Sequence, residues 1–449
     1  MTNLPFGFGP QDPDEHGENK PSGQGGNSPF GGGGDGAIDF GQLGQMLSQL
    51  GQMLSQAGNT GGGPVNYDLA KQIAVQRLTP SGLGGSEAKD VAQVKEAMHL
   101  AELWLDPVTT LPAGATKVDA WSARDWVERT LNTWQRLCDP VARRVSGAWV
   151  DALPSEAKEA AGPLLSIVGQ MGGMAFGSQL GGALAQLGSE VLTSTEVGLP
   201  LGAEGTAALL PANIEKFTAG LERPEREVML FLAAREAAHH RLFTHVPWLR
   251  QRLLATVEEF ARGISVDTSA LEQLASKVDP ANPQSIEEAM SSGLLEPQTT
   301  DAQKAALTRL ETLLALVEGW VDVVVAEAVG DRLPGADALR ETLRRRRASG
   351  GPAEQTFATL VGLELRPRRL RDASNLWQML STQHGIQARD DVWAHPDLVP
   401  TADDLDEPID YVRRVGEGPA QLEDPMAELE RTERAEREQD EPPSSTEEG

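Results

Sequence analysis

The chain has 449 residues, long enough to bury one large core or two ordinary ones, and its formal net charge of −27 disfavours a partner that presents phosphates. A single cysteine, Cys138, excludes an intramolecular disulfide framework and a cysteine-rich zinc module. The first residues contain no basic stretch followed by an apolar run, as a secretory signal would. We therefore expect a cytoplasmic protein that binds no nucleic acid and does not insert stably into a membrane.

Residues 1–63 form a glycine-rich arm with 18 of the 47 glycines. Its few apolar side chains cannot offset the entropy lost on ordering, so we expect it to be mostly disordered. The heptad LGQMLSQ occurs there twice in tandem, at 43–49 and 50–56, and would place leucine and methionine on one helical face. Two heptads with internal glycines are marginal alone, which favours packing on the chain's own body, or fraying, over docking on a partner.

Residues 64–414 are predicted to form one helical domain. Stretches such as SEAKDVAQVKEAMHLAELWL and DAQKAALTRLETLLALVEGWVDVVVAEAV place apolar residues on one helical face opposite a charged face. Because the alternation typical of strands is almost absent, we predict a mainly α fold with little or no sheet. Residues 415–449 follow as an acidic tail with the composition of a disordered segment.

The segment 162–189 carries no charge, and Gly169, Gly173, Gly177 and Gly181 recur in it at every fourth position. This spacing lets helix backbones approach closely. The segment is long enough to span a membrane, but its glutamines, serines and glycines keep its hydropathy modest. We therefore expect a buried core helix or helix pair.

The stretch AAREAAHHRLFTHVPWL, residues 233–249, contains three of the seven histidines. Pro224, followed by acidic residues in the first turn, predicts a helix that ends before Pro247. Three other groups are expected to be structural. Cys138 is predicted to be a buried thiol, the run LRRRRAS at 343–349 a solvated helix end, and His384 and His395 surface or structural residues.

Part of this helix matches the His-Glu-x-x-His pattern, in which two histidines one turn apart bind zinc and the glutamate acts as general base. Glu236 and His239 occupy its second and fifth places. Arg235 occupies the first, and a guanidinium does not lose its proton to become a ligand. The residues alone leave open a metal site and a metal-free pair of histidines.

A metal site needs a third ligand, and Glu318 in LALVEGWVDVVVAEA is the best candidate. Asp322 lies one turn later, a spacing found where a glutamate binds zinc and an aspartate supports a ligating histidine. Unpaired carboxylates are unfavourable in so apolar a helix, so both need partners. The partner of Glu318 is either a metal or Arg235.

The chain resembles a bacterial family of zincin-like hydrolases, metallopeptidase-like in sequence. The likeness extends from GPVNYDLA through REAAHHRLFTHVPWL and ALVEGWVDVVVAEA to GIQARDDVWAHPDLVPTADDLDEPIDYVRR. It implies a helical zincin-like fold with zinc as cofactor. Carried over by position, it implies Glu236 as general base, His239 as zinc ligand, Glu318 as third ligand and Asp322 as the partner of a ligand. The first ligand does not carry over, because Arg235 fills its place.

Three interpretations of the altered motif follow. In the first, zinc binds a shifted set of Glu236, His240 and Glu318. In the second, His239 and Glu318 hold a metal weakly while Glu236 remains the base. In the third, Arg235 pairs with Glu318 and supplies the positive charge of the metal. His245 is a poor substitute ligand, since it lies on another helical face.

These interpretations give two functional hypotheses. The chain is a zinc-dependent hydrolase of metallopeptidase type with REAAHH as an altered motif, or it is a peptide- or protein-binding module that keeps the zincin fold without the metal. The first predicts stoichiometric zinc, and the second predicts a salt bridge between Arg235 and Glu318. The sequence names neither a substrate nor an oligomeric state.

Overall fold

The structure, a computed structural model, describes residues 63–78, 87–151, 162–263, 300–348 and 369–417. The tandem heptad and most of the predicted acidic tail lie outside these ranges. The main helices are α2 (Tyr67–Leu78), α3 (Ala88–Leu105), α4 (Ala123–Asp151), α6 (Gly162–Gly188), α7 (Pro211–Ala219), α8 (Glu225–His245), α9 (Pro247–Arg262), α12 (Asp301–Val329), α13 (Ala336–Ala348), α15 (Leu370–Asp391), α16 (Ala402–Asp406) and α17 (Pro408–Gly416). Short 3-10 helices are η2 (Gly330–Arg332), η3 (Val392–Ala394) and η4 (Pro396–Leu398).

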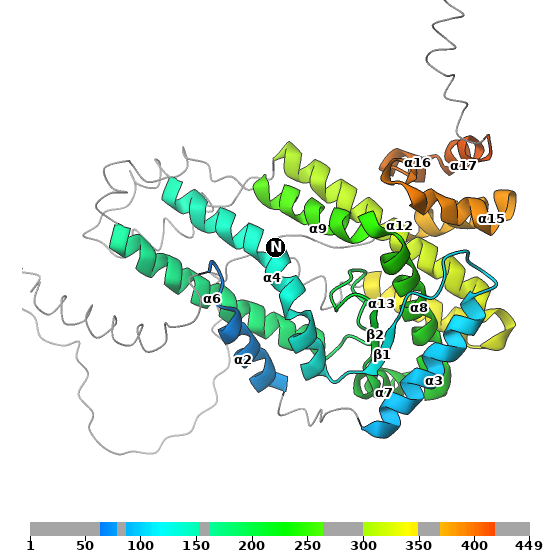
Figure 1. Ribbon diagram of the computed structural model, residues 1–449, viewed down its shortest axis with the longest axis horizontal. Helices are drawn as coiled ribbons and strands as arrows, with labels where there is room; N and C mark the ends of the chain where they lie inside the picture. The colour runs from blue at the N-terminus through cyan, green and yellow to red at the C-terminus, as the bar shows by residue number, and fades with distance from the viewer. Residues whose placement is uncertain (1–62, 79–86, 152–161, 264–299, 349–368, 418–449) are drawn as a thin grey trace, which may run out of the picture.

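The helices α8 and α12 form the centre of the fold. Both are buried on nearly every side over most of their length, as is typical of a core helix rather than a surface helix. They pack on each other, and α3, α9 and α15 pack around them. Figure 1 shows α2, α4 and α6 side by side at one end of the molecule and α15, α16 and α17 at the other, with α8 between.

The boundaries of α8 follow the predicted signals. Pro224 directly precedes the helix. The first turn contains Glu225 and Glu227, whose negative charges interact favourably with the positive end of the helix dipole. The helix ends at His245, and Pro247 begins α9. The prediction of a helix that ends before Pro247 is confirmed.

The described residues contain one sheet, of two short parallel strands: β1 (Lys117–Ala120) and β2 (Thr206–Leu209). An isolated antiparallel bridge joins Thr193 to Leu209 at the end of β2. The prediction of a mainly α fold with little sheet is therefore confirmed. The strands matter for the site because one edge of β2 faces α8.

The glycines of α6 allow a close approach to α2. A Cβ on Gly177 would meet the carbonyl oxygen of Asn66 at 2.4 Å, and one on Gly181 would meet that of Ala70 at 2.5 Å. The predicted close approach of helix backbones is therefore found at Gly177 and Gly181, whereas a Cβ on Gly169 would meet nothing within 4 Å. None of the helices in the described ranges is long and apolar enough to cross a bilayer.

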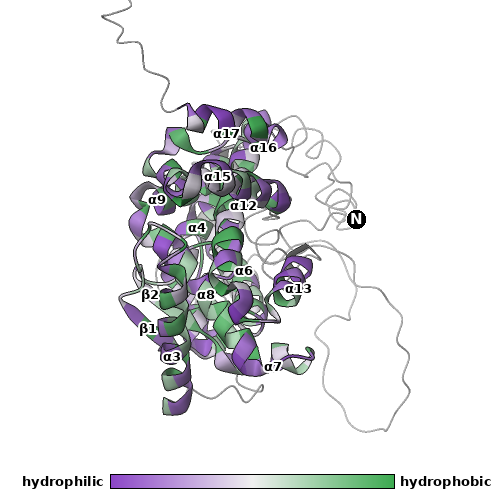
Figure 2. Cartoon of the chain, turned by 90° about the vertical axis from the view of Figure 1, so that its right-hand side faces the viewer, coloured by the Kyte–Doolittle hydropathy of each residue, from purple (hydrophilic) through white to green (hydrophobic). Residues whose placement is uncertain are grey.

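The prediction that the arginine run forms a solvated helix end is wrong for part of α13. Arg344 binds the buried Asp322 through Nη2 at 2.5 Å. Arg346 donates to the carbonyl oxygen of Glu190 at 2.5 Å. Only Arg345 among these three is exposed. Figure 2 shows α13 as a mostly hydrophilic helix, and its arginines attach it to the body together with the buried Leu339 and Leu343.

The C-terminal helices are fastened to α12 by a buried aspartate. Asp390 of α15 accepts hydrogen bonds from the indole of Trp320 at 2.9 Å and from the hydroxyl of Thr109 at 2.7 Å. The guanidinium of Arg389 lies 2.8 Å from the same carboxylate. These contacts join three distant parts of the chain and hold α12 in place. Cys138 is buried, as predicted, and burial raises the pKa of its thiol.

Candidate functional site

Arg235, His239 and Glu318 meet where α8 contacts α12. The Nη2 atom of Arg235 lies 2.6 Å from Oε2 of Glu318, and Nε2 of His239 lies 3.1 Å from Oε1. The side chains of Glu318 and His239 are only 2% and 1% exposed, and that of Arg235 is 12% exposed. One buried carboxylate therefore serves two nitrogen groups, as a buried charge requires.

The geometry fixes the protons of His239. Its Nδ1 lies 2.8 Å from the carbonyl oxygen of Arg235, one helical turn earlier. Because that oxygen can only accept a hydrogen bond, Nδ1 carries a proton. The other ring nitrogen, Nε2, faces Oε1 of Glu318. The site thus brings a guanidinium and an imidazole nitrogen to one carboxylate.

Glu236 lies on the other side of α8 and faces the loop before β2. Its carboxylate accepts hydrogen bonds from the hydroxyls of Ser194 and Thr195, the latter at 2.5 Å, and from the backbone N–H groups of Thr195 and Ala208, both at 3.2 Å. The side chain is fully buried. Glu236 therefore holds the loop and the free edge of β2 against α8.

This environment makes Glu236 a strong acid. Burial alone would raise its pKa, but the neighbouring His240 and the hydroxyls of Ser194 and Thr195 lower it to about 2. The Nε2 atom of His240 lies 3.3 Å from the carboxylate. Glu236 is ionised at neutral pH, with both oxygens engaged.

Asp322 lies one turn after Glu318 but has different partners. It binds Nε and Nη2 of Arg340 at 2.8 and 2.5 Å, Nη2 of Arg344 at 2.5 Å and the hydroxyl of Ser374 at 3.1 Å. Burial acts to raise its pKa, and the hydrogen bond and charge of Arg340 outweigh burial and lower it. The structure thus places Asp322 against arginines of α13 rather than against a histidine.

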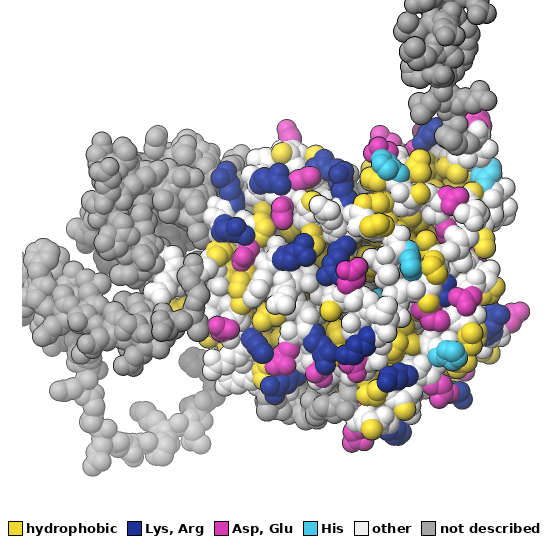
Figure 3. All heavy atoms as spheres, in the orientation of Figure 1, with side chains coloured by type: hydrophobic (Ala, Val, Ile, Leu, Met, Phe, Trp, Pro, Cys, Tyr) yellow, Lys and Arg dark blue, Asp and Glu magenta, His cyan; other side chains and the backbone are white. Residues whose placement is uncertain are grey.

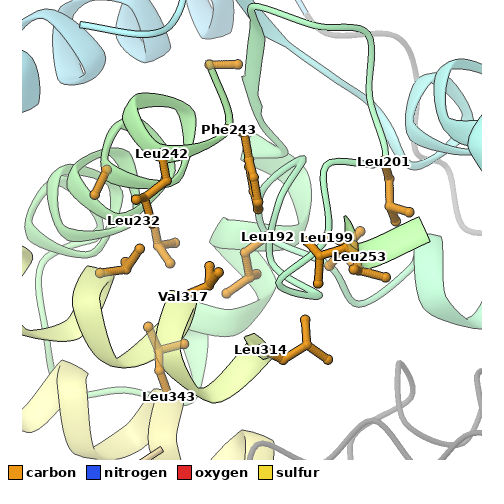
Figure 4. Packing of buried hydrophobic residues seen from close by; sticks show 14 of the residues in the cluster. Leu192, Leu199, Leu201, Leu232, Leu242, Phe243, Leu253, Leu314, Val317 and Leu343 are labelled. Carbon is orange, nitrogen blue, oxygen red and sulfur yellow. The ribbon is translucent and has the colours of Figure 1, made fainter. Parts of the chain in front are cut away.

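A small cleft, narrow and partly open to solvent, lies beside this site. Its lining combines apolar walls with polar and charged groups: Thr193, Glu196, Leu232, Arg235, His239 and Leu343. Figure 4 shows Leu232 of α8, Leu192 of the loop before β2 and Val317 of α12 pointing toward one another in the core. The cleft is therefore bounded by α8, α13 and the loop before β2.

Gly198 closes the loop over Glu318. Its φ of +77° is a conformation that favours glycine, and a Cβ there would lie 3.1 Å from Oε1 of Glu318. The loop thus passes so near the carboxylate that a larger residue would press on it. Sequence reasoning missed this position, and only its placement in the loop TSTEVGLP gave a signal.

The residues present do not fit a zinc ion. A tetrahedral zinc with ligands at about 2.0–2.1 Å places neighbouring donor atoms about 3.3 Å apart, close to the separation of His239 and Glu318. However, the third position is occupied by Arg235, and no three His, Cys, Asp or Glu side chains gather into a metal-holding group within the described ranges. The structure does not bring Glu236 and His240 to Glu318, as the shifted ligand set required.

The remaining histidines lie elsewhere. His245 is exposed and contacts the carbonyl oxygen of Ala113 at 3.2 Å. His384 and His395 are exposed on the C-terminal elements, where His395 accepts a hydrogen bond from the backbone N–H of Asp397. None of the three lines the cleft beside Arg235.

Comparison with known proteins agrees with this fold. Residues 65–412 match a family model described as zincin-like metallopeptidase. The chain belongs to this family. Among solved structures, it is similar to a Chloroflexus aurantiacus protein described as a "putative hydrolase with a novel fold", with a TM-score of 0.54, 18% identity, and coverage of 78% of this chain and 99% of that one. At this identity the similarity shows the fold alone. No curated protein matches the chain.

Proposed function

We propose that this chain is a metal-independent member of the zincin-like family, whose cleft binds a peptide segment of a partner protein without hydrolysing it. The observation that carries the proposal is the 2.6 Å ion pair between Arg235 and Glu318, at the place where the family motif has its first metal ligand. An arginine cannot act as a ligand, and its planar group suits a carboxylate.

The charge at the site supports this interpretation. The guanidinium of Arg235 brings a positive charge to Glu318, as a bound cation would. Asp322, one turn away, pairs with two further arginines from α13. Glu318 and Asp322 are therefore both balanced by arginine without a metal.

Glu236 supports the absence of hydrolysis independently of the metal. A general base works best with a pKa near the working pH and an oxygen free to take a proton. The pKa of Glu236 is about 2, and its two oxygens accept four hydrogen bonds from the loop and β2. In this account Glu236 fixes the loop that forms one wall of the cleft.

The shape of the cleft favours a peptide as the ligand. Leu232 and Leu343 give apolar walls, while Thr193 and Glu196 provide polar groups beside them. Arg235, 12% exposed and paired with Glu318, also lines the cleft. The cleft is narrow and partly open to solvent, so it suits a side chain of an extended segment rather than a folded domain.

The experiment is a selection of peptides from a random displayed library on the intact protein, followed by affinity measurements with variants. Arg235→Met should weaken the selected peptides at least tenfold, or about 1.4 kcal/mol. Arg226→Met is the matched control, because Arg226 lies on the same helix but is 75% exposed. Equal affinity of both variants would contradict the proposed cleft.

Zinc-dependent hydrolysis is the second candidate function. The 3.1 Å separation of His239 Nε2 and Glu318 Oε1, near that of two ligands of one ion, favours it. This candidate predicts that zinc added to the intact protein leads to cleavage of the selected peptides. It also predicts that Glu236→Gln abolishes cleavage while leaving peptide binding unchanged.

A further inference from the structure

A second cavity, narrow and partly open to solvent, lies on a neighbouring side of α8. The loop before β2 forms one wall, and α8 and α9 form the other. Among its lining residues are Thr195, Glu204, His240, Phe243, Thr244 and Arg250. Neither Arg235 nor His239 lines it, so it is separate from the cleft described above.

Arg250 of α9 brings a positive charge to this cavity. Its side chain is partly buried and donates a hydrogen bond to the carbonyl oxygen of Gly202 at 3.3 Å. Among the residues that the structure describes, no carboxylate lies within ion-pair distance of it. Burial lowers the pKa of Arg250, as does the nearby Arg136, while Glu204 acts in the other direction. Burial of a cation without a close anion is unfavourable, which points to an anionic partner.

His240 adds a second polar group that lacks a full set of partners. Its side chain is only 7% exposed and lines the cavity. Its Nε2 atom lies 3.3 Å from Glu236 but makes no aligned hydrogen bond there. A ligand in the cavity can therefore use the hydrogen-bonding capacity of the imidazole, while Phe243 gives an apolar surface beside it.

We infer that this cavity binds a small carboxylate, with the planar group of Arg250 holding both carboxylate oxygens and an aliphatic part packing on Phe243. The guanidinium of Arg250 attracts an anion, and its planar group suits a carboxylate. The nearby carboxylates of Glu204 and Glu236 favour a single negative charge over a phosphate dianion, which they would repel more strongly. The carboxylate has two possible sources, the C-terminus of a peptide or a free small acid.

This inference does not rest on the proposed function of the cleft. It uses Arg250 and His240, whereas peptide binding beside α13 uses Arg235. Both cavities lie against α8 and the loop before β2, but no residue lines both: the loop contributes Thr193 and Glu196 to one and Ser194 and Thr195 to the other. Failure of one proposal is therefore distinguishable from failure of the other by the variants used.

The test is calorimetric titration of the full chain with N-acetyl-alanyl-alanine, with its C-terminal amide and with propionate. The free carboxylate should bind at least tenfold more tightly than the amide. Arg250→Gln should lose at least tenfold in affinity, and Arg250→Lys, which keeps the charge without the planar fork, should fall between. Arg252→Gln is the matched control, because Arg252 lies on the same helix and is exposed.

Thermal unfolding of each variant without ligand shows whether it is folded, so that a loss of binding is attributed to the site. Binding of propionate as tight as that of the dipeptide supports the inference with a free acid as the source, and preference for the dipeptide supports a peptide terminus. Equal binding of the acid and the amide, or unchanged binding by folded Arg250→Lys and Arg250→Gln, would overturn it.

Discussion

Arg235 and Glu236 are neighbours in sequence, yet they face different sides of α8 and meet different kinds of partner. On the cleft side, Arg235 and His239 meet a single carboxylate from α12, so charge is balanced by charge. On the loop side, the carboxylate of Glu236 is held mainly by hydroxyl and backbone N–H groups. The comparison indicates that the motif is divided into an ionic half and a hydrogen-bonded half, and that each half stabilises a different wall of the cleft.

The hydrogen-bonded half should be the more costly to remove. Glu236→Ala leaves buried donors of Ser194, Thr195 and Ala208 without an acceptor, and we expect a loss of about 4–5 kcal/mol in the free energy of unfolding. Denaturant unfolding measures it. Glu225→Ala in the exposed first turn of the same helix is the control and should change stability little. A loss below about 1 kcal/mol would show that Glu236 is not structural.

The ionic half should show strong coupling between its members. Glu318→Leu removes the carboxylate that the buried Arg235 and His239 both contact and should cost about 3–4 kcal/mol, whereas adding Arg235→Met should restore much of that loss. A double-mutant cycle by denaturant unfolding gives the coupling energy. If the two losses simply add, the ion pair does not contribute as the structure suggests.

Lowering the pH should reduce the stability that Glu236 contributes, over a range set by its pKa. The pKa of Glu236 falls from an ordinary 4.5 to about 2 in the folded protein. The ionised Glu236 contributes fully to the free energy of unfolding above pH 4.5, and this contribution is lost as the pH falls toward 2. The reason is that Glu236 takes up its proton at a higher pH in the unfolded chain than in the folded protein. The integrated loss is about 3 kcal/mol. The stability gap between the intact protein and Glu236→Gln should narrow over this range, and a constant gap would argue against it.

The smallest expected loss of stability concerns α13, whose Leu343 lines the cleft. Asp322→Asn weakens the pairs with Arg340 and Arg344, and we expect a loss of about 2 kcal/mol. Amide hydrogen exchange in residues 336–348 should become faster. Glu341→Gln, at an exposed pair with Arg345, is the control and should leave that exchange unchanged. Equal exchange in both variants would mean that apolar contacts, not arginines, hold α13.

Local signals predicted most of the fold. Apolar periodicity gave the helices, and proline with acidic residues gave the start of α8. Glycine spacing predicted the close approach of α6, which is found at Gly177 and Gly181. These features depend on neighbouring residues, so a single sequence contains them. The parallel strands β1 and β2 are too short to show a pattern of their own.

The partners of the site residues were harder to predict. The ion pair of Arg235 and Glu318 was one of three alternatives, because a buried carboxylate needs a cation but the sequence does not say which. The hydroxyls that hold Glu236 lie 41 and 42 positions earlier in the chain, in a loop without a recognisable motif. The arginines that hold Asp322 belong to a run that resembles a solvated helix end. Such pairings are set by tertiary packing rather than by local pattern.

The most direct test of the divided motif is the zinc content of protein purified without chelator or metal-affinity tag, compared with Arg235→His. In the variant a histidine would join His239 and Glu318 to complete a three-ligand set. The account predicts almost no zinc in the intact protein, near-stoichiometric zinc in the variant, and no peptide cleavage by either, since Glu236 remains bound to its loop. Near-stoichiometric zinc in the intact protein would contradict the account.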